Sequence, residues 1–432
     1  MTADGIFWTR RTPQLAAFLW MLLLLTLIVG ADLKAPQALV GNDYHTAFYV
    51  AGWMAAHGQL AELYPQAGAT TFHGAPFDLT VHKMLPGVDS HVVGQFMYSP
   101  LVAYLFAPLS TFAPAIGQLI WQAFNFLLLA LSCYFIADLT KSGRNVKKDF
   151  SVLALFALTI LSASFFFLPI FNTLWLGQMD IALGLLPMAA GAWLLSRNKD
   201  LASGLVFSIV SLKPQFLPAV ALICLGLLLH KRWQMLVGLV LGVAAIVGLS
   251  YATAGATIVH NWFSSLKISE GMFTGEFRNP DYLAGCLPLS ILITASPADR
   301  LNLKPVAYLV TAIGLFANIA MVVWLSRRKF EPEIWLRLLI VVSVLPIFVY
   351  SPRLLTYDWS LLLLPISVSL YAGKSDRLVT GLLLALALLV DIEVVLQFTA
   401  TTYVCPLLLT GPGTLLAVAI VVMSLDFKSS KS

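Results

Sequence analysis

The sequence contains little charge. Asp, Glu, Lys and Arg make up 11% of its 432 residues and hydrophobic residues make up 59%, whereas a soluble domain carries about 25% charged residues. This scarcity excludes an ordinary soluble protein. Apolar stretches of about twenty residues recur along the chain instead, which is the length that an α-helix needs to cross a bilayer. The composition therefore predicts an all-α polytopic membrane protein.

Cysteines, metal-site patterns and nucleotide-binding motifs are also scarce or missing. The four cysteines lie singly in apolar surroundings, so no CxxC pair indicates a redox or zinc centre. Most of the seven histidines fall in residues 45–91, but none has the i, i+4 or HxH spacing of a metal site. The sequence has no P-loop and no GxGxxG motif. We therefore expect no metal, no cofactor and no soluble nucleotide donor.

The charges that do occur form short basic clusters between the apolar stretches. These clusters lie at residues 10–11, 141–148, 197–199, 231–232, 327–329, 374–377 and 428–431. Because cytoplasmic loops are enriched in Lys and Arg, the clusters and both termini are predicted to face the cytoplasm. Residues 33–98 hold more acidic than basic residues and are predicted to face outward. The net charge of +5 is thus a signal of topology and does not indicate nucleic-acid binding.

The clusters and the apolar stretches together predict about twelve membrane spans in a single domain of residues 1–432. The clearest spans are residues 14–32, 115–138, 151–171, 179–196, 234–255, 305–325, 334–350, 359–373, 378–396 and 406–425. Residues 201–229 lie between two inward clusters, so we interpret them as two short helices broken at Lys213-Pro214. Residues 99–112 and 283–296 are too short for confident spans and are predicted to be re-entrant or interfacial helices.

Two long segments remain for the outward face, residues 33–98 and residues 256–304. In the first, the apolar residues of segment 44–63 recur at helical spacing, which predicts an amphipathic helix on the membrane surface. Asp43 stands directly before this helix, shortly after the first span. An acid just outside the first membrane helix is where an enzyme acting on a lipid-linked substrate would keep a general base.

Several short motifs then occur in a recognisable order. They are Asp43-Tyr44, Tyr98-Ser99-Pro100-Leu101, Gly177-Gln178, Lys213-Pro214, and Ser351-Pro352-Arg353 followed by Tyr357-Asp358-Trp359. In this order the motifs resemble glycosyltransferase family 87, a group that depends on polyprenol-phosphate sugars and includes phosphatidylinositol-mannoside mannosyltransferases. The resemblance implies a fold of the GT-C superfamily and an essential acid in the first outward loop. Family members often have His where Arg353 stands, so the sugar and the acceptor stay open.

The expected chemistry needs few groups. A sugar on a lipid phosphate already has a leaving group, so the enzyme must supply a base, cations for the departing phosphate and groups that orient the sugar. Asp43 is the predicted base, and a single displacement with one carboxylate would invert the anomeric centre. The alternative is that Asp43 merely caps the helix that follows it. Lys213, Arg353 and Arg278 are the predicted phosphate-binding cations. They could instead be interfacial cations, or Lys213 and Arg353 could be ion-pair partners of Asp180 and Asp358.

A further set of residues is predicted to contact the substrates through hydroxyl, amide, carboxylate or aromatic groups. These residues are Tyr44, His45, Tyr98, Gln178, Asp180, Gln215, Tyr357 and Asp358. The aromatic members could equally belong to an interfacial belt, and the acids could pair with cations for structural reasons.

The sequence therefore predicts an inverting hexosyltransferase of the plasma (inner) membrane, with its active site on the outer, periplasmic face. It would move a mannose-like hexose from a polyprenyl-phosphate donor to a lipid or glycan acceptor in glycolipid biosynthesis of the cell envelope. Its partners would be these substrates and the membrane lipids. A polysaccharide polymerase or ligase and a lipid-linked glycan transporter remain the alternatives. The polar residues gather at one face, which favours the one-sided enzyme over the transporter.

Overall fold

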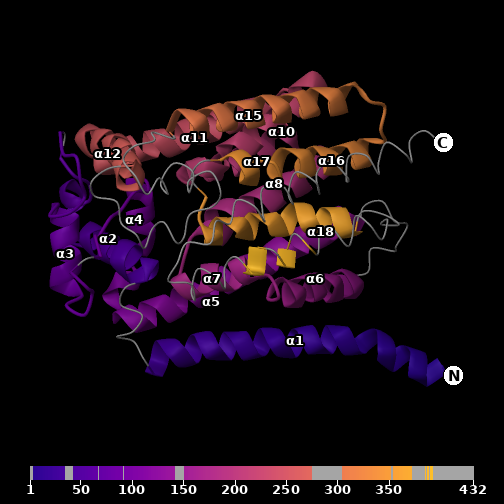
Figure 1. Ribbon diagram of the computed structural model, residues 1–432, viewed down its shortest axis with the longest axis horizontal. Helices are drawn as coiled ribbons and strands as arrows, with labels where there is room; N and C mark the ends of the chain where they lie inside the picture. Colours follow the sequence, from indigo (N-terminus) through magenta and orange to yellow (C-terminus); the bar gives the residue numbers. More distant parts are fainter. Residues whose placement is uncertain are drawn as a thin grey trace.

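The fold is known from a computed structural model that describes residues 3–34, 42–66, 68–90, 92–141, 150–274, 304–351, 354–371, 385, 387–388 and 390–392. Within these residues the secondary structure is helical and no strand element occurs. The prediction of an all-α protein is therefore confirmed for the described part of the chain. Figure 1 shows the long helices side by side, with the short helices α2, α3 and α4 gathered at one end.

The helices in chain order are α1 (Ala3–Lys34), η1 (Tyr44–Tyr49), α2 (Val50–Ala56), η2 (Leu60–Glu62), α3 (Pro76–Met84), α4 (Pro100–Phe106), η3 (Leu109–Thr111), α5 (Pro114–Lys141), α6 (Phe150–Ser164), α7 (Leu168–Leu176), η4 (Ile181–Leu185), α8 (Leu186–Ser196), α9 (Asp200–Phe207), η5 (Ser208–Leu212), η6 (Pro214–Phe216), α10 (Leu217–Leu229), α11 (Gln234–Ala254), α12 (Ala256–Thr274), α15 (Lys304–Arg327), α16 (Pro332–Val344), α17 (Ile347–Tyr350), η7 (Thr356–Leu362) and α18 (Leu363–Tyr371).

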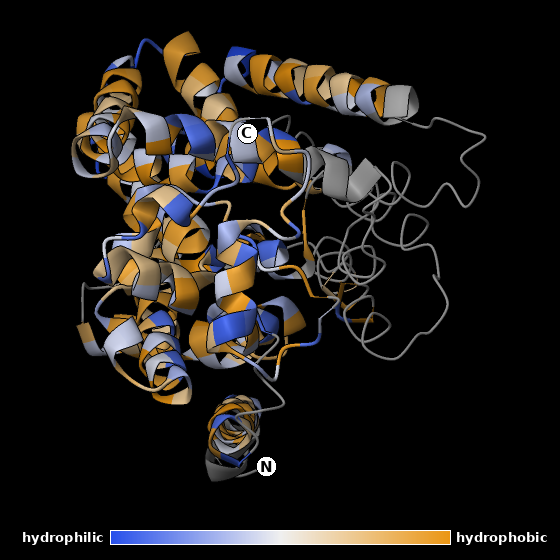
Figure 2. Ribbon diagram, turned by 90° about the vertical axis from the view of Figure 1, so that its left-hand side faces the viewer, coloured by the Kyte–Doolittle hydropathy of each residue, from blue (hydrophilic) through white to orange (hydrophobic). Residues whose placement is uncertain are grey.

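Four helices of the described chain are long and apolar enough to cross a membrane. They lie in α1, α5, α11 and α15, and the bent pair α6–α7 would make a fifth span if it crosses as one unit. Many of their apolar side chains are exposed, as expected for helices that face lipid, and Figure 2 shows apolar residues along most of the helices. These findings support membrane insertion. The predicted count of about twelve spans is not confirmed.

Several predicted elements differ from the observed ones. The predicted span 151–171 is broken, because α6 and α7 meet at an angle of 82°. Pro169 lies in the first turn of α7, where proline is tolerated because its missing N–H would have no helical partner. The predicted outward loop 256–304 begins with the helix α12. Its remainder up to residue 303 lies outside the described residues, and so does the predicted short helix 283–296.

The predicted break in residues 201–229 is present, whereas the predicted surface helix differs in its surroundings. The chain breaks at Lys213-Pro214, between η5 and η6, and short helices lie on both sides of the break. Segment 44–63 is helical at its start, but neighbouring protein covers most of η1 and α2. Helix α2 packs against α4, and η1 packs against α4 and α5. The apolar face predicted for the membrane surface is therefore buried inside the protein. Spans 378–396 and 406–425 lie largely outside the described residues.

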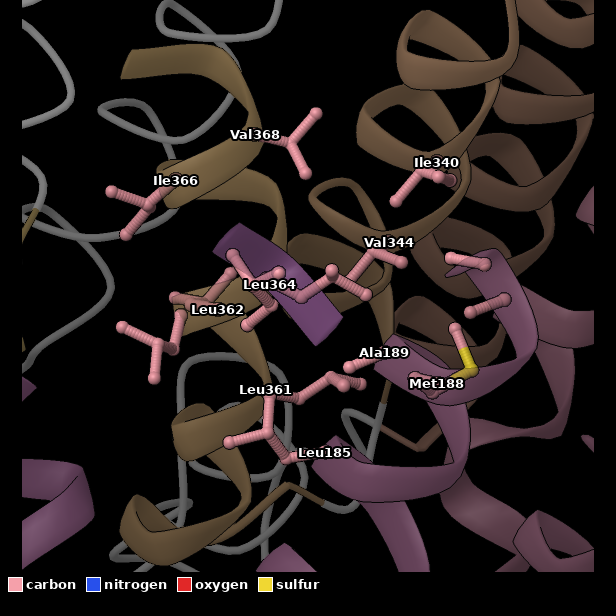
Figure 3. Packing of buried hydrophobic residues seen from close by; sticks show 14 of the residues in the cluster. Leu185, Met188, Ala189, Ile340, Val344, Leu361, Leu362, Leu364, Ile366 and Val368 are labelled. Carbon is pink, nitrogen blue, oxygen red and sulfur yellow. The ribbon is translucent and has the colours of Figure 1, made fainter. Parts of the chain in front are cut away.

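Two clusters of buried apolar residues hold the bundle together. The larger runs through the long helices and joins η4, α8, α16, η7 and α18, and Figure 3 shows Leu185, Val344 and Leu361 among its members. The smaller cluster joins η1, α2, α3 and α4 to the first turns of α5. Because η7 is tied to the larger cluster and η1 to the smaller, the segments that carry the candidate site are held by both.

Helix α5 links two chemically different ends of the bundle. Gln118, near the start of α5, contacts the segment that carries Asp43, whereas Arg337 donates to the carbonyl oxygen of Leu139 at its other end, at 3.1 Å. Arg197, from a predicted cytoplasmic cluster, pairs with Asp138 at the same far end. Since a helix of 28 residues is about 40 Å long, the first loop and these basic groups lie on opposite sides of the bundle.

Candidate active site

Asp43 begins the helical segment η1 without capping it. Its side chain makes no capping hydrogen bond, and the backbone N–H of His45 instead donates to the side-chain oxygen of Asn42 at 3.1 Å. The Asp43 carboxylate is half-buried and accepts a hydrogen bond from the side-chain amide of Gln178 at 2.5 Å. The alternative in which Asp43 is a helix cap is therefore wrong, because Asn42 has that role.

The amide of Gln178 is oriented by Tyr98. The Tyr98 hydroxyl donates to Oε1 of Gln178 at 3.3 Å, which leaves the donor end of the amide for Asp43. Tyr98 is in turn fixed by Tyr64, whose hydroxyl donates to the Tyr98 carbonyl oxygen at 2.6 Å. Burial raises the pKa of Asp43 above its usual range, against the opposing effects of the Gln178 hydrogen bond and the Lys213 charge. A carboxylate with a raised pKa is a stronger proton acceptor than an ordinary Asp.

Lys213 lies between two carboxylates beneath this pair. Its Nζ is 2.5 Å from Oδ1 of Asp180 and 2.9 Å from Oδ1 of Asp358, and all three side chains are at most 1% exposed. Asp358 also accepts hydrogen bonds from the backbone N–H of Leu355 at 2.7 Å and from the Gln215 amide at 3.1 Å. Two acids thus enclose one cation, and the ion-pair alternative for Lys213 is the arrangement observed.

This pairing bears directly on the predicted phosphate-binding role of Lys213. The positive charge is already matched by two carboxylates, and the ammonium group has almost no open surface. A bound phosphate would have to displace one of the acids and leave it buried without its partner, which is costly. Arg278 and Arg353, the other two predicted phosphate ligands, lie outside the described residues.

The accessible part of the site is polar and aromatic. The ring of Tyr357 lies over Lys213, with Nζ 4.9 Å from the ring centroid, and its backbone oxygen accepts from Thr173 at 3.2 Å. Asp43, Tyr98, Tyr357 and Gln215 all keep part of their surface open. Together they offer a base, two aromatic rings with hydroxyl groups and an amide, which are the groups that a sugar and an acceptor hydroxyl require.

The structure brings most of the predicted site residues together from segments far apart in the sequence. Those that meet are Asp43, Tyr98, Gln178, Asp180, Lys213, Gln215, Tyr357 and Asp358. Of these, Gln178, Asp180, Lys213 and Asp358 are buried and form a floor beneath the four half-buried groups. Among the residues that the structure describes, no group of three His, Cys, Asp or Glu side chains could hold a metal ion.

Tyr44 and His45 lie on η1 with their side chains buried. Tyr44 is 0% exposed and His45 is 2% exposed, so neither side chain is open to a substrate in this arrangement. Tyr44 packs against Gly177, where a Cβ atom would lie 2.7 Å from Cβ of Tyr44. Gly177 also has a φ of +66°, which a residue with a side chain rarely adopts. Tyr44 therefore shapes the turn before Gln178, and a substrate contact of Tyr44 or His45 stays a prediction.

The sequence interpretation also missed several residues that support the site. Asn42 caps η1, while Trp121 and Asn125 of α5 donate to the carbonyl oxygens of Gly177 and Gln178. A signal was present, since Gln118, Gln122 and Asn125 are spaced by four and three residues within an apolar span. That spacing places them on one face of a helix.

Comparison with known families identifies the kind of protein to which this geometry belongs. The family model for glycosyltransferase family 87 matches residues 96–352, more than half of the chain. The chain belongs to glycosyltransferase family 87. As a family 87 member it is a membrane glycosyltransferase, and a GT-C fold is consistent with this assignment. The matched region includes Tyr98, Gln178 and Lys213, whereas Asp43 precedes it and Asp358 follows it. No curated protein and no solved structure matches the chain.

Proposed function

We propose that this family 87 enzyme transfers a hexose, with mannose favoured, from a polyprenyl-phosphate donor to a hydroxyl group of a lipid or glycan acceptor. The observation that carries the proposal is the state of Asp43. Its carboxylate is half-buried, has a raised pKa, caps no helix and is held by an amide that Tyr98 orients. These are the properties of a general base in a protected site.

The reaction is a single displacement. Asp43 accepts the proton of the acceptor hydroxyl while that oxygen attacks the anomeric carbon of the sugar. The bond between the anomeric carbon and the phosphate oxygen breaks, and polyprenyl phosphate leaves with the electron pair. The products are the glycosylated acceptor with inverted anomeric configuration, polyprenyl phosphate and a protonated Asp43, which then loses its proton to water.

The remaining groups divide into two roles. Tyr98, Tyr357 and Gln215 are half-buried beside Asp43 and orient the sugar and acceptor through their rings, hydroxyl groups and amide. The charge of Lys213 is already neutralised by Asp180 and Asp358. We therefore assign the contacts to the leaving phosphate to Arg353 and Arg278, whose planar guanidinium groups suit bidentate phosphate binding.

A direct assay tests the donor class. Purified enzyme should release polyprenyl phosphate when it is supplied with a polyprenyl-phosphate hexose and an extract of acceptor lipids, with mass spectrometry of the products as the measurement. A panel of mannosyl, glucosyl and galactosyl donors identifies the sugar. Turnover with a nucleotide sugar alone, or with a diphosphate-linked oligosaccharide alone, would refute the proposed donor.

The proposed orientation places Asp43 on the outer face of the membrane. The basic clusters at residues 197–199 and 327–329 belong to the opposite end of the bundle from the first loop, and such clusters mark the cytoplasmic side. In a background with all four native cysteines replaced, Gly87→Cys should therefore react in intact cells or spheroplasts with a membrane-impermeant maleimide. Gly87 is exposed and a Cβ atom there meets no neighbour.

The matched control is Lys329→Cys, at an exposed position after α15. It should react with the same reagent only after lysis. Labelling of Lys329→Cys in intact cells together with protection of Gly87→Cys would place Asp43 in the cytoplasm and contradict the proposed orientation.

A further inference from the structure

Helix α5 carries a polar stripe inside an apolar membrane span. Gln118 and Asn125 are fully buried, and Gln122 lies between them on the same face of the helix. Polar side chains at membrane depth are costly unless they are hydrogen-bonded, and their presence calls for a role. Gln118 and Asn125 each contact a segment that carries one partner of the Asp43–Gln178 hydrogen bond.

Gln118 holds the segment of Asp43. Its Oε1 accepts a hydrogen bond from the side-chain amide of Asn42 at 3.0 Å, and its Nε2 donates to Oδ1 of Asp32 on α1 at 3.2 Å. The same Nε2 lies 3.3 Å from the carbonyl oxygen of Trp175. Asp32 therefore fixes the amide of Gln118 so that its oxygen faces Asn42. Asn42 caps η1, and Asp43 is the next residue, so its backbone position follows from this contact.

The same helix holds the segment of Gln178. Nε1 of Trp121 donates to the Gly177 carbonyl oxygen at 2.7 Å, and Nδ2 of Asn125 donates to the Gln178 carbonyl oxygen at 2.8 Å. Both bonds are buried. One rigid element thus determines the separation of the two partners, although η1 and the turn after α7 are distant in the sequence.

We propose that Gln118 is a positioning residue for sugar transfer. Its hydrogen bond with Asn42 fixes the backbone next to Asp43, and this places the Asp43 carboxylate beside the Gln178 amide. This inference rests on the proposed function, in which Asp43 is the base. The hydrogen bonds of Gln118 go to Asn42, Asp32 and Trp175, and its side chain is fully buried. It acts through Asn42, so its loss should displace the base without removing it. A displacement of about 1 Å at a reacting group can reduce turnover on the order of a hundredfold.

The test begins with Gln118→Leu, which keeps the volume and removes the hydrogen bonds of Gln118 to Asn42, Asp32 and Trp175. We expect kcat to fall about tenfold to a hundredfold, with little change in KM for either substrate. The acidic limb of the kcat/KM profile should also move to higher pH. The Gln178 hydrogen bond lowers the pKa of Asp43, so a weaker bond raises that pKa and leaves less of the base ionised at a given pH.

Apart from Asp32, which loses its hydrogen bond from Gln118, the other ionisable groups around Asp43 keep their hydrogen bonds in this variant. They are Tyr44, His45 and Tyr49 on η1, Tyr98 before α4, Lys213 and Asp180 in the floor, and Tyr357 and Asp358 on η7. Asn42→Ser leaves the bond between Gln118 and Asp32 in place, so a shift of the acidic limb that both variants share reports the contact between Asp43 and Gln178.

Two further variants keep the inference falsifiable. Asn42→Ser retains a side-chain oxygen that can cap η1 but loses the amide that donates to Gln118, and it should reproduce the lower kcat and the pH shift. The double variant should be no worse than Gln118→Leu alone, because Gln118→Leu already removes the contact that Asn42→Ser removes. Gln122→Leu, which removes a neighbouring buried amide of α5 that has no bond to Asn42, is the matched control and should keep the wild-type pH profile.

The outcomes separate this inference from the proposed function. If Asn42→Ser and a folded Gln118→Leu both retain the wild-type kcat and pH profile while Asp43→Asn is inactive, Asp43 is the base and Gln118 does not position it. If Asp43→Asn is active, the proposed function fails whatever the two α5-linked variants show. If Gln118→Leu does not fold, the kcat and pH profile of Asn42→Ser decide whether Gln118 positions Asp43, because the serine oxygen still caps η1.

Discussion

Asp43→Asn should lower the rate of sugar transfer on the order of a hundredfold or more while leaving the protein folded, as expected for loss of a general base. Asn has nearly the same shape as Asp and can still accept the hydrogen bond from Gln178, so the local packing is preserved. What it loses is the ability to take the proton from the acceptor hydroxyl. The measurement is the single-turnover release of polyprenyl phosphate, with thermal unfolding of the detergent-solubilised protein measured in parallel.

Glu62→Gln is the matched control for this prediction. Glu62 is an exposed acid in η2 of the same loop, so neutralising it removes the same charge from the first loop at a different position. It should transfer sugar at the wild-type rate. Near-normal transfer by Asp43→Asn would contradict the assignment of Asp43 as base, and equal losses in both variants would point to a general effect of charge in the loop.

The pH dependence of the wild-type enzyme supplies an independent check on the same residue. Asp43 must be ionised to accept a proton, and burial raises its pKa. The rate should therefore fall as the pH is lowered through a value above the ordinary Asp pKa of about 3.9. The rate falls toward low pH because a protonated Asp43 can no longer accept the proton of the acceptor hydroxyl. In Asp43→Asn the residual rate should no longer show this acidic limb.

Much of the fold could be predicted from the sequence because its strongest signals are local. Apolar runs near twenty residues identified the helices α1, α5, α11 and α15, and Pro214 after Lys213 identified the break in residues 201–229. The bend between α6 and α7 was missed because an unbroken apolar run hides it, although Pro169 was a signal of a new helix start. The burial of η1 and α2 could not be predicted, since helical spacing does not reveal whether protein or lipid covers a face.

The site was predictable in its members and less so in their roles. Residues from motifs far apart in the sequence meet around Asp43, but the sequence left Lys213 open as a phosphate ligand or an ion-pair partner. The choice depends on which groups surround the ammonium in space, and the structure places Asp180 and Asp358 there. Gln118 and Asn125 were not predicted, because they lie in a membrane span and the residues predicted for the site lie in or next to the loops between spans.

The second large effect is expected at the buried ion-paired cluster of Lys213, Asp180 and Asp358. Lys213→Gln should destabilise the folded protein by about 3–5 kcal/mol, because it leaves two buried carboxylates facing each other without a cation. Asp180 and Asp358 are each 0% exposed, so water cannot replace the lost charge. The expected result is less protein in the membrane and a lower unfolding temperature. A cation that only held the donor phosphate would behave differently, since its loss would lower turnover in a protein of normal stability.

A charge-free version of the cluster distinguishes these two roles. The triple variant Lys213→Met, Asp180→Asn and Asp358→Asn removes the cation together with both acids, so no buried charge is left unpaired. We expect it to recover most of the stability that Lys213→Gln loses, because neutral replacement of a buried ion pair is often tolerated. Its turnover then measures what the charges contribute to catalysis beyond folding. If Lys213→Gln instead has normal stability and a turnover reduced on the order of a hundredfold, Lys213 is the phosphate ligand that the sequence first indicated, and the two acids must separate from it when the donor binds.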